Sequence, residues 1–92
     1  SSIEIENVLF KHKDIIDAAV VAKKDDKWGE VPCAFVTLKK NSTLKAKEIF
    51  QFCRNNMASF KIPKNIIFGK IEKTPTGKTQ KYLLRKRVNL ID

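Results

Sequence analysis

The sequence has 92 residues, of which 42% are hydrophobic, and carries a formal net charge of +9 at pH 7. This length limits the chain to one small domain with one modest core, and the hydrophobic fraction argues against a disordered protein. No apolar run is long enough to span a membrane, and no charged-then-apolar segment at the start is typical of a signal peptide.

The positive charge is concentrated in the last third of the chain. Residues 59–92 contain nine Lys or Arg against two acids, a balance of +7, whereas residues 1–58 contain ten against eight, a balance of +2. Such a field attracts phosphate groups, whether these belong to nucleic acid, anionic lipid or a nucleotide cofactor.

The first elements predicted along the chain are a helix and two strands. Ser1 followed by Glu4 has the capping-box pattern, and apolar residues then repeat at helical spacing, which predicts a helix to about Lys11. The β-branched run from Ile15 to Ala22 predicts a buried strand. A second strand is predicted from Val31 to Leu38, pairing with the first in antiparallel fashion after a charged loop.

The second half of the chain predicts helix, strand and helix. Residues 41–43 are expected to form a turn and an N-cap for an amphipathic helix over 45–56. Residues 65–68 predict a short third strand, and 80–88 a basic helix with Tyr82, Leu83 and Leu84 as candidates for its inward face. The fold class is therefore α+β: a small domain with a β-hairpin and a short three-stranded sheet, flanked by about three helices.

The cysteines and the histidine do not form a metal site or a catalytic set. Cys33 and Cys53 are far apart in apolar settings, which favours two buried thiols and a cytoplasmic protein over a disulfide framework. His12 has no second ligand candidate nearby, so no metal site is predicted.

The string Thr76-Gly77-Lys78-Thr79 suggests a phosphate-binding loop at first. A P-loop needs another glycine five residues before Gly77, however, and that position is Glu72. A turn that contains Pro75 and Gly77 has another use, because it presents one side chain at a fixed place, and a lysine suits an oxyanion on another domain. The alternative is that Lys78 is a solvated surface lysine, which composition alone favours.

Two further segments contain an aromatic residue, and the role of each segment has two interpretations. Trp28 in a polar loop is either a core anchor or a stacking platform for a flat ring. The segment Phe60-Lys61-Ile62-Pro63-Lys64 is either a holder for a base and its phosphates or an ordinary connector.

Six segments in order resemble the C-terminal domain of adenylate-forming enzymes, a superfamily of acyl-CoA synthetases, aryl-CoA ligases, luciferases and peptide-synthetase adenylation domains. The resemblance covers nearly the whole chain. The matching segments are Ser2-Ile3-Glu4-Ile5-Glu6, Ala18-Ala19-Val20-Val21, Trp28-Gly29-Glu30-Val31-Pro32, Ala34-Phe35-Val36, Phe60-Lys61-Ile62-Pro63-Lys64 and Thr74-Pro75-Thr76-Gly77-Lys78, the last running into Lys81, Leu84 and Arg85.

The resemblance implies that residues 1–92 are the C-terminal lid domain of such an enzyme, with the N-terminal domain and the hinge absent. The lid rotates between a pose for making acyl-AMP from ATP and a carboxylic acid and a pose for transferring the acyl group to CoA. It implies that Lys78 is the adenylation lysine, positioned by the turn of Pro75 and Gly77.

The same resemblance implies CoA contacts at Trp28, Phe60 and Lys64. Ile62 stands where some members have a second basic residue, and Lys61 is the candidate replacement. ATP or AMP, CoA and, in the full-length enzyme, Mg²⁺ are the implied cofactors, and the N-terminal adenylation domain is the implied partner. The lid alone is expected to be inactive and to bind none of them stably. A nucleic-acid-binding module and an interaction domain in which Trp28 and Phe60 are core are the rival hypotheses.

Overall fold

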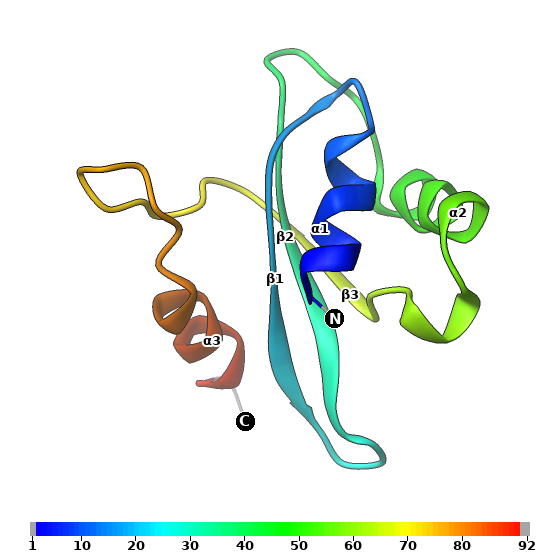
Figure 1. Ribbon diagram of the computed structural model, residues 1–92, viewed down its shortest axis with the longest axis vertical. Coiled ribbons are helices and arrows are strands. Elements are labelled where there is room, and N and C mark those ends of the chain that lie inside the picture. Colours follow the sequence, from blue (N-terminus) through cyan, green and yellow to red (C-terminus); the bar gives the residue numbers. More distant parts are fainter. Residues whose placement is uncertain (1, 91–92) are drawn as a thin grey trace.

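The computed structural model describes residues 2–90, which form three α-helices, one short 3-10 helix and a three-stranded sheet (Figure 1). The α+β prediction is confirmed, while the capping role predicted for Ser1 lies outside the described residues. The elements in chain order are α1 (Ser2–Phe10), β1 (Ile15–Asp25), β2 (Gly29–Leu38), α2 (Ala46–Asn56), the 3-10 helix η1 (Ser59–Lys61), β3 (Asn65–Phe68) and α3 (Lys81–Asn89).

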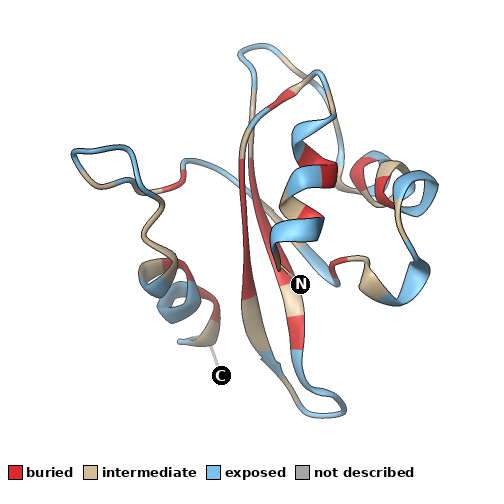
Figure 2. Cartoon of the chain, viewed as in Figure 1, coloured by how far each residue is buried: buried red, intermediate tan, exposed pale blue. Residues whose placement is uncertain are grey.

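The sheet has the strand order β1-β2-β3, with β1 antiparallel and β3 parallel to β2. The predicted antiparallel pair is confirmed, but the hairpin is longer than predicted because the charged residues after Ala22 continue the pairing. Lys24 lies opposite Glu30, and Asp25 opposite Gly29. The tip of this hairpin extends beyond the helices that cover the centre of the sheet (Figure 2). Its charged side chains therefore remain in water.

Two helices cover one face of the sheet, and the third covers the other (Figure 1). On the α1 and α2 face, Ala18, Val20, Ala34 and Val36 pack with helix residues that include the fully buried Leu9, Ile49 and Cys53. On the α3 face, the alternate strand residues pack against one buried helix position, Leu84, and a second, Val88. The alternation of strand side chains therefore divides the small core into two clusters.

A β-bulge near the start of β1 changes which face its residues occupy. Ile15 lies opposite Leu38 and Asp17 opposite Thr37, so Ile16 is an extra residue on β1. Because of this insertion, Ile15 packs in the α1-side cluster although Ala19 belongs to the α3-side cluster. Asp17, two residues before Ala19, is thereby placed on the α3 face.

The free edge of β1 is covered by side chains from both layers. Glu6 of α1 accepts a hydrogen bond from the Val20 amide at 2.8 Å. Asn89 of α3 accepts one from the Lys24 amide at 2.9 Å and donates one to the Ala22 carbonyl at 3.4 Å. These bonds satisfy the edge and fasten α1 and α3 to the same strand.

Two local predictions are wrong. The N-cap of α2 is Lys45, not a residue of 41–43, because Ser42 is held elsewhere: its hydroxyl donates to Asp14 Oδ2 at 2.8 Å. Tyr82 is 61% exposed rather than inward-facing, because the buried stripe of α3 is Leu84 and Val88, one turn apart. Among the residues that the structure describes, no helix is long and apolar enough to cross a membrane.

Candidate functional site

Lys78 is presented by a tight hairpin of its own. Thr74 accepts a hydrogen bond from the Gly77 amide at 2.9 Å, which closes a β-turn with Pro75 at its second position. Gly77 has a φ of 87°, in the left-handed region that glycine adopts without steric cost. The predicted turn of Pro75 and Gly77 is therefore confirmed as a turn.

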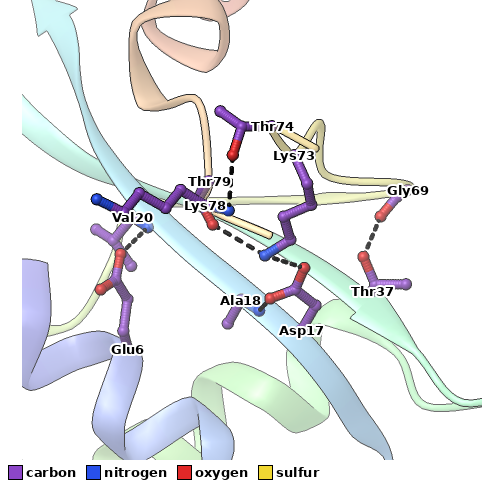
Figure 3. A network of polar contacts seen from close by, with 10 residues as sticks. All are labelled: Glu6, Asp17, Ala18, Val20, Thr37, Gly69, Lys73, Thr74, Lys78 and Thr79. Atoms are coloured by element: carbon purple, nitrogen blue, oxygen red, sulfur yellow. Dashed lines mark hydrogen bonds and ion pairs between the residues drawn. The ribbon is translucent and has the colours of Figure 1, made fainter. Parts of the chain in front are cut away.

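The backbone of Lys78 is fixed at both of its polar groups. Its amide donates to Thr74 Oγ1 at 3.0 Å, and its carbonyl accepts from the Thr74 amide at 2.8 Å. One step further out, Lys73 and Thr79 form an antiparallel bridge. The turn thus holds the Cα of Lys78 while leaving its side chain to point away from the hairpin (Figure 3).

The side chain of Lys78 is exposed, and its ammonium group has no ion pair or hydrogen bond with any described residue. Three other cations of the same region are paired instead: Lys73 with Asp17, Lys81 with Glu6 and Arg87 with Glu72. A cation without a partner on a fixed backbone is suited to an anion supplied by another molecule or domain.

A second surface lies on the opposite side of the sheet, beside α1. An open groove of about 350 Å³ runs between the start of α1, the middle of β1, the start of β2, and η1. Phe60 borders it and is 81% exposed, and the Lys61 ammonium lies 5.7 Å from the Phe60 ring centre. Lys61 also pairs with Glu4 at 3.0 Å, so its charge is partly compensated within the domain. The groove lining is Ser2, Ile5, Val20, Val21, Ala22, Glu30, Val31, Pro32, Phe60 and Lys61.

The remaining predicted residues, Lys64 and Trp28, lie outside the groove lining. Lys64 is exposed, and its amide donates to the Pro32 carbonyl at 2.9 Å, which docks the segment against β2. Trp28 lies in the turn at the tip of the β1–β2 hairpin, where its backbone amide donates a hydrogen bond to Asp25 Oδ2 at 2.8 Å. Trp28 is 65% exposed, and the Lys27 ammonium lies 4.9 Å from its ring centre. The hypothesis that Trp28 and Phe60 are core residues is therefore wrong.

Arg54 was not among the residues predicted from the sequence. It borders a hollow with Phe50, Ser59 and Lys64, and so brings a second cation beside the predicted segment. In the sequence Arg54 is simply a polar residue off the apolar face of a helix, and that pattern does not distinguish it from other solvated positions.

The cysteines offer no reactive thiol. Both are fully buried, and burial raises the pKa of the Cys33 thiol and of the Cys53 thiol above the usual value. Within residues 2–90, no cluster of three or more His, Cys, Asp or Glu side chains could hold a metal ion. The chemistry that the described part of the chain offers is thus that of exposed cations and aromatic rings.

Comparisons with known proteins match the chain to one family. Residues 4–78 match the family described as the AMP-binding enzyme C-terminal domain. A 2-methylpropanoate–CoA ligase of Humulus lupulus is 50% identical over 88 residues, and a peroxisomal acetate/butyrate–CoA ligase of Arabidopsis thaliana is 44% identical over 92 residues. These alignments cover 92% and 95% of this chain but only 16% of each relative.

Solved structures have the same fold. A fatty acyl CoA synthetase of Mycobacterium tuberculosis superposes with a TM-score of 0.88 and 34% sequence identity, over 95% of this chain and 17% of that protein. The chain therefore spans about a sixth of the length of the proteins that it matches.

Proposed function

Because the chain belongs to the family of AMP-binding enzyme C-terminal domains, we propose that it is the mobile C-terminal lid of a longer acyl-CoA synthetase. That enzyme would activate a carboxylic acid with ATP and transfer the acyl group to CoA. The observation that carries this proposal is Lys78: an exposed, uncompensated cation on a turn whose backbone is held at both polar groups.

Lys78 would act in the adenylation step. A carboxylate oxygen attacks the α-phosphorus of ATP, the bond to the β-phosphate oxygen breaks, and acyl-AMP and pyrophosphate form. Negative charge from the carboxylate and the phosphate meets at the reacting centre. An ammonium group placed between these oxygens offsets that charge and lowers the barrier, and a preformed turn lets it do so without reorganisation.

The groove beside Phe60 would serve the second step, in which the CoA thiolate attacks the acyl carbonyl and AMP leaves. The exposed Phe60 ring offers a stacking surface for the adenine base, and Lys61 and Lys64 offer cations for its phosphates. Trp28 at the hairpin tip would supply a second aromatic contact. Arg54 adds a cation beside Lys64.

The two surfaces lie on opposite sides of the sheet, and this arrangement supports a rotation between the steps (Figure 1). One pose of the domain would turn the Lys78 hairpin to the active centre, and the other would turn the groove to it. The N-terminal adenylation domain of the same enzyme would be the partner in both poses. No step of this proposal runs through a metal held by residues 2–90, and Mg²⁺ would accompany ATP in the full-length enzyme.

The acid is expected to be recognised outside this domain, so an assay needs a panel. Acetate, butyrate and 2-methylpropanoate appear in the names of the relatives and form the first panel. A cytoplasmic location stays a prediction, since the Arabidopsis relative is peroxisomal.

Separate assays of the two half-reactions test the proposal. In the full-length enzyme, Lys78→Ala should lower acyl-AMP formation from ATP and the acid, measured as ATP–pyrophosphate exchange, by about 100- to 1000-fold, the loss typical of removing one oxyanion-stabilising group. Thioester formation from supplied acyl-AMP should be largely retained. Equal loss of both half-reactions would contradict the assignment of Lys78 to one pose.

A further inference from the structure

The hairpin that carries Lys78 touches the sheet through few contacts. Residues 73, 75, 76, 77 and 78 are exposed, and no buried side chain lies between Ile71 and Leu84 (Figure 2). Its internal bonds fix Lys78 relative to Thr74, but they do not fix the hairpin relative to the domain. Its position must therefore depend on contacts at its base.

Two polar anchors tie that base to neighbouring residues of the sheet, in addition to the pair of Arg87 on α3 with Glu72. Asp17 Oδ2 lies 2.8 Å from the Lys73 ammonium, which also donates to Thr79 Oγ1 at 2.9 Å. Thr37 donates its hydroxyl to the Gly69 carbonyl at 2.6 Å. Asp17 and Thr37 are directly opposite each other on β1 and β2, so the two anchors act at one place on the sheet (Figure 3).

The position of Asp17 depends on the bulge at Ile16. Without this extra residue, alternation would place Asp17 on the α1 face, given where Ile15 packs. The other carboxylate oxygen of Asp17 accepts the Ala18 amide at 2.9 Å, which holds the carboxylate at the strand edge. Lys73 is thus joined to a fixed acceptor on one side and to the far strand of its own hairpin on the other.

We propose that Asp17 and Lys73 are positioning residues for adenylation, and that their ion pair sets where Lys78 meets the substrate. This inference rests on the proposed function of Lys78. Lys73 spans the two stems of the hairpin and ties both to β1, so its loss removes this tie and loosens the hairpin while leaving the internal turn intact. The ion pair is only partly exposed, with side-chain exposures of 35% for Lys73 and 22% for Asp17.

The test compares Lys73→Met with a matched control, Lys39→Met. Lys39 also pairs with a half-buried aspartate of the β1 region, Asp14, at 3.1 Å, but it does not contact the Lys78 hairpin. Both variants remove one positive charge and one ion pair. Lys73→Arg, which keeps the pair, serves as the conservative variant.

Nuclear magnetic resonance on the 92-residue chain tests the positioning without reference to activity. Lys73→Met should lower the ¹⁵N order parameters of Thr74, Gly77 and Lys78 from about 0.85 toward 0.6, values that separate rigid from flexible backbone. Lys39→Met and Lys73→Arg should leave them as in the parent chain. Unchanged order parameters in Lys73→Met would overturn the positioning role.

Kinetics of the full-length enzyme test its consequence. With acetate, butyrate and 2-methylpropanoate as probes, Lys73→Met should lower the kcat of acyl-AMP formation about tenfold or more, because small displacements of a catalytic group have effects of this size. The KM for ATP and thioester formation from supplied acyl-AMP should change little.

If Lys78→Ala abolishes adenylation while Lys73→Met and Lys39→Met have the same kcat for acyl-AMP formation, the positioning role fails and the proposed function stands. If Lys78→Ala has no effect, the proposed function fails, and the order parameters alone decide whether the pair holds the hairpin.

Discussion

The Lys78 hairpin and the Phe60 groove both carry an exposed side chain that is, or lies beside, a lysine, yet they are built in different ways. The hairpin has a network of hydrogen bonds around one side chain that has no partner in the described part of the chain. In the groove, the ring is exposed and the nearest cation, Lys61, is already paired with Glu4. A fixed single charge suits one reacting centre, whereas an aromatic ring beside a loosely held cation suits an extended nucleotide.

The largest expected effect on stability comes from removing a core side chain of α3, the helix that follows the Lys78 hairpin. Leu84 is fully buried in the α3-side cluster, and Leu84→Ala should lower the free energy of unfolding by about 2–5 kcal/mol. Urea denaturation of the 92-residue chain measures this. Leu90→Ala is the control, because Leu90 is 70% exposed and should cost less than about 0.5 kcal/mol. Similar losses for the two variants would contradict the packing of α3.

A change on the groove side should affect CoA alone. Phe60→Ala removes a stacking surface worth about 1–3 kcal/mol per base, so we expect the KM for CoA in the full-length enzyme to rise by about tenfold. Acyl-AMP formation should be unchanged. The matched control is Phe10→Ala, since Phe10 is 49% exposed at the other end of α1. An equal rise in both variants would show that the effect is not specific to the groove.

Alanine substitutions of Gly77 and Gly29 compare the Lys78 turn with the tip of the β1–β2 hairpin. The expected loss of folding stability is the same at both sites. Gly77 has a φ of 87° and Gly29 a φ of 80°, and an added Cβ meets nothing within 4 Å at either site. Alanine at each should therefore cost about 1–2 kcal/mol through the left-handed backbone alone. Gly77→Ala should also slow acyl-AMP formation, while Gly29→Ala should not. Equal rates for the two variants would remove the special role of the Lys78 turn.

The smallest expected effect is a pH dependence outside both surfaces. Hydrogen bonds from Ser42 and then Lys39 hold the pKa of the Asp14 carboxyl below its usual value of 3.8. A carboxyl with a depressed folded pKa stabilises the fold above its unfolded pKa, and that contribution is lost as pH falls through the folded pKa. Asp14→Asn should therefore be less stable than the parent at pH 6 by urea denaturation. The difference should vanish in acid, and a constant difference would contradict the pKa direction.

Most helices and strands could be predicted because their patterns are local. The run of β-branched residues predicts β1, and the periodic apolar face predicts α2. Each pattern is contained within the element itself. Tyr82 is exposed because Arg85 and Lys86 follow it on its side of α3, and the stripe that packs against the sheet is that of Leu84 and Val88. The N-cap of α2 was misplaced because the partner of Ser42 is the distant Asp14.

Only part of the candidate site could be predicted from the sequence. Proline and glycine predict the turn around Lys78, but composition favours a solvated lysine there, and the family resemblance supplied the adenylation role. The Asp17–Lys73 pair depends on a bulge and on residues far apart in the chain, so no local pattern reveals it. The single acid within the apolar run of 15–22, Asp17, marks one member of the pair in the sequence but not its partner.

The most direct test of the two-surface account measures both half-reactions in Lys78→Ala and Phe60→Ala of the full-length enzyme. The account predicts a crossed result. Lys78→Ala should lose acyl-AMP formation and keep thioester formation, and Phe60→Ala should keep acyl-AMP formation and weaken the use of CoA. If each variant impairs both half-reactions in the same proportion, the hairpin and the groove do not serve separate steps, and the account is contradicted.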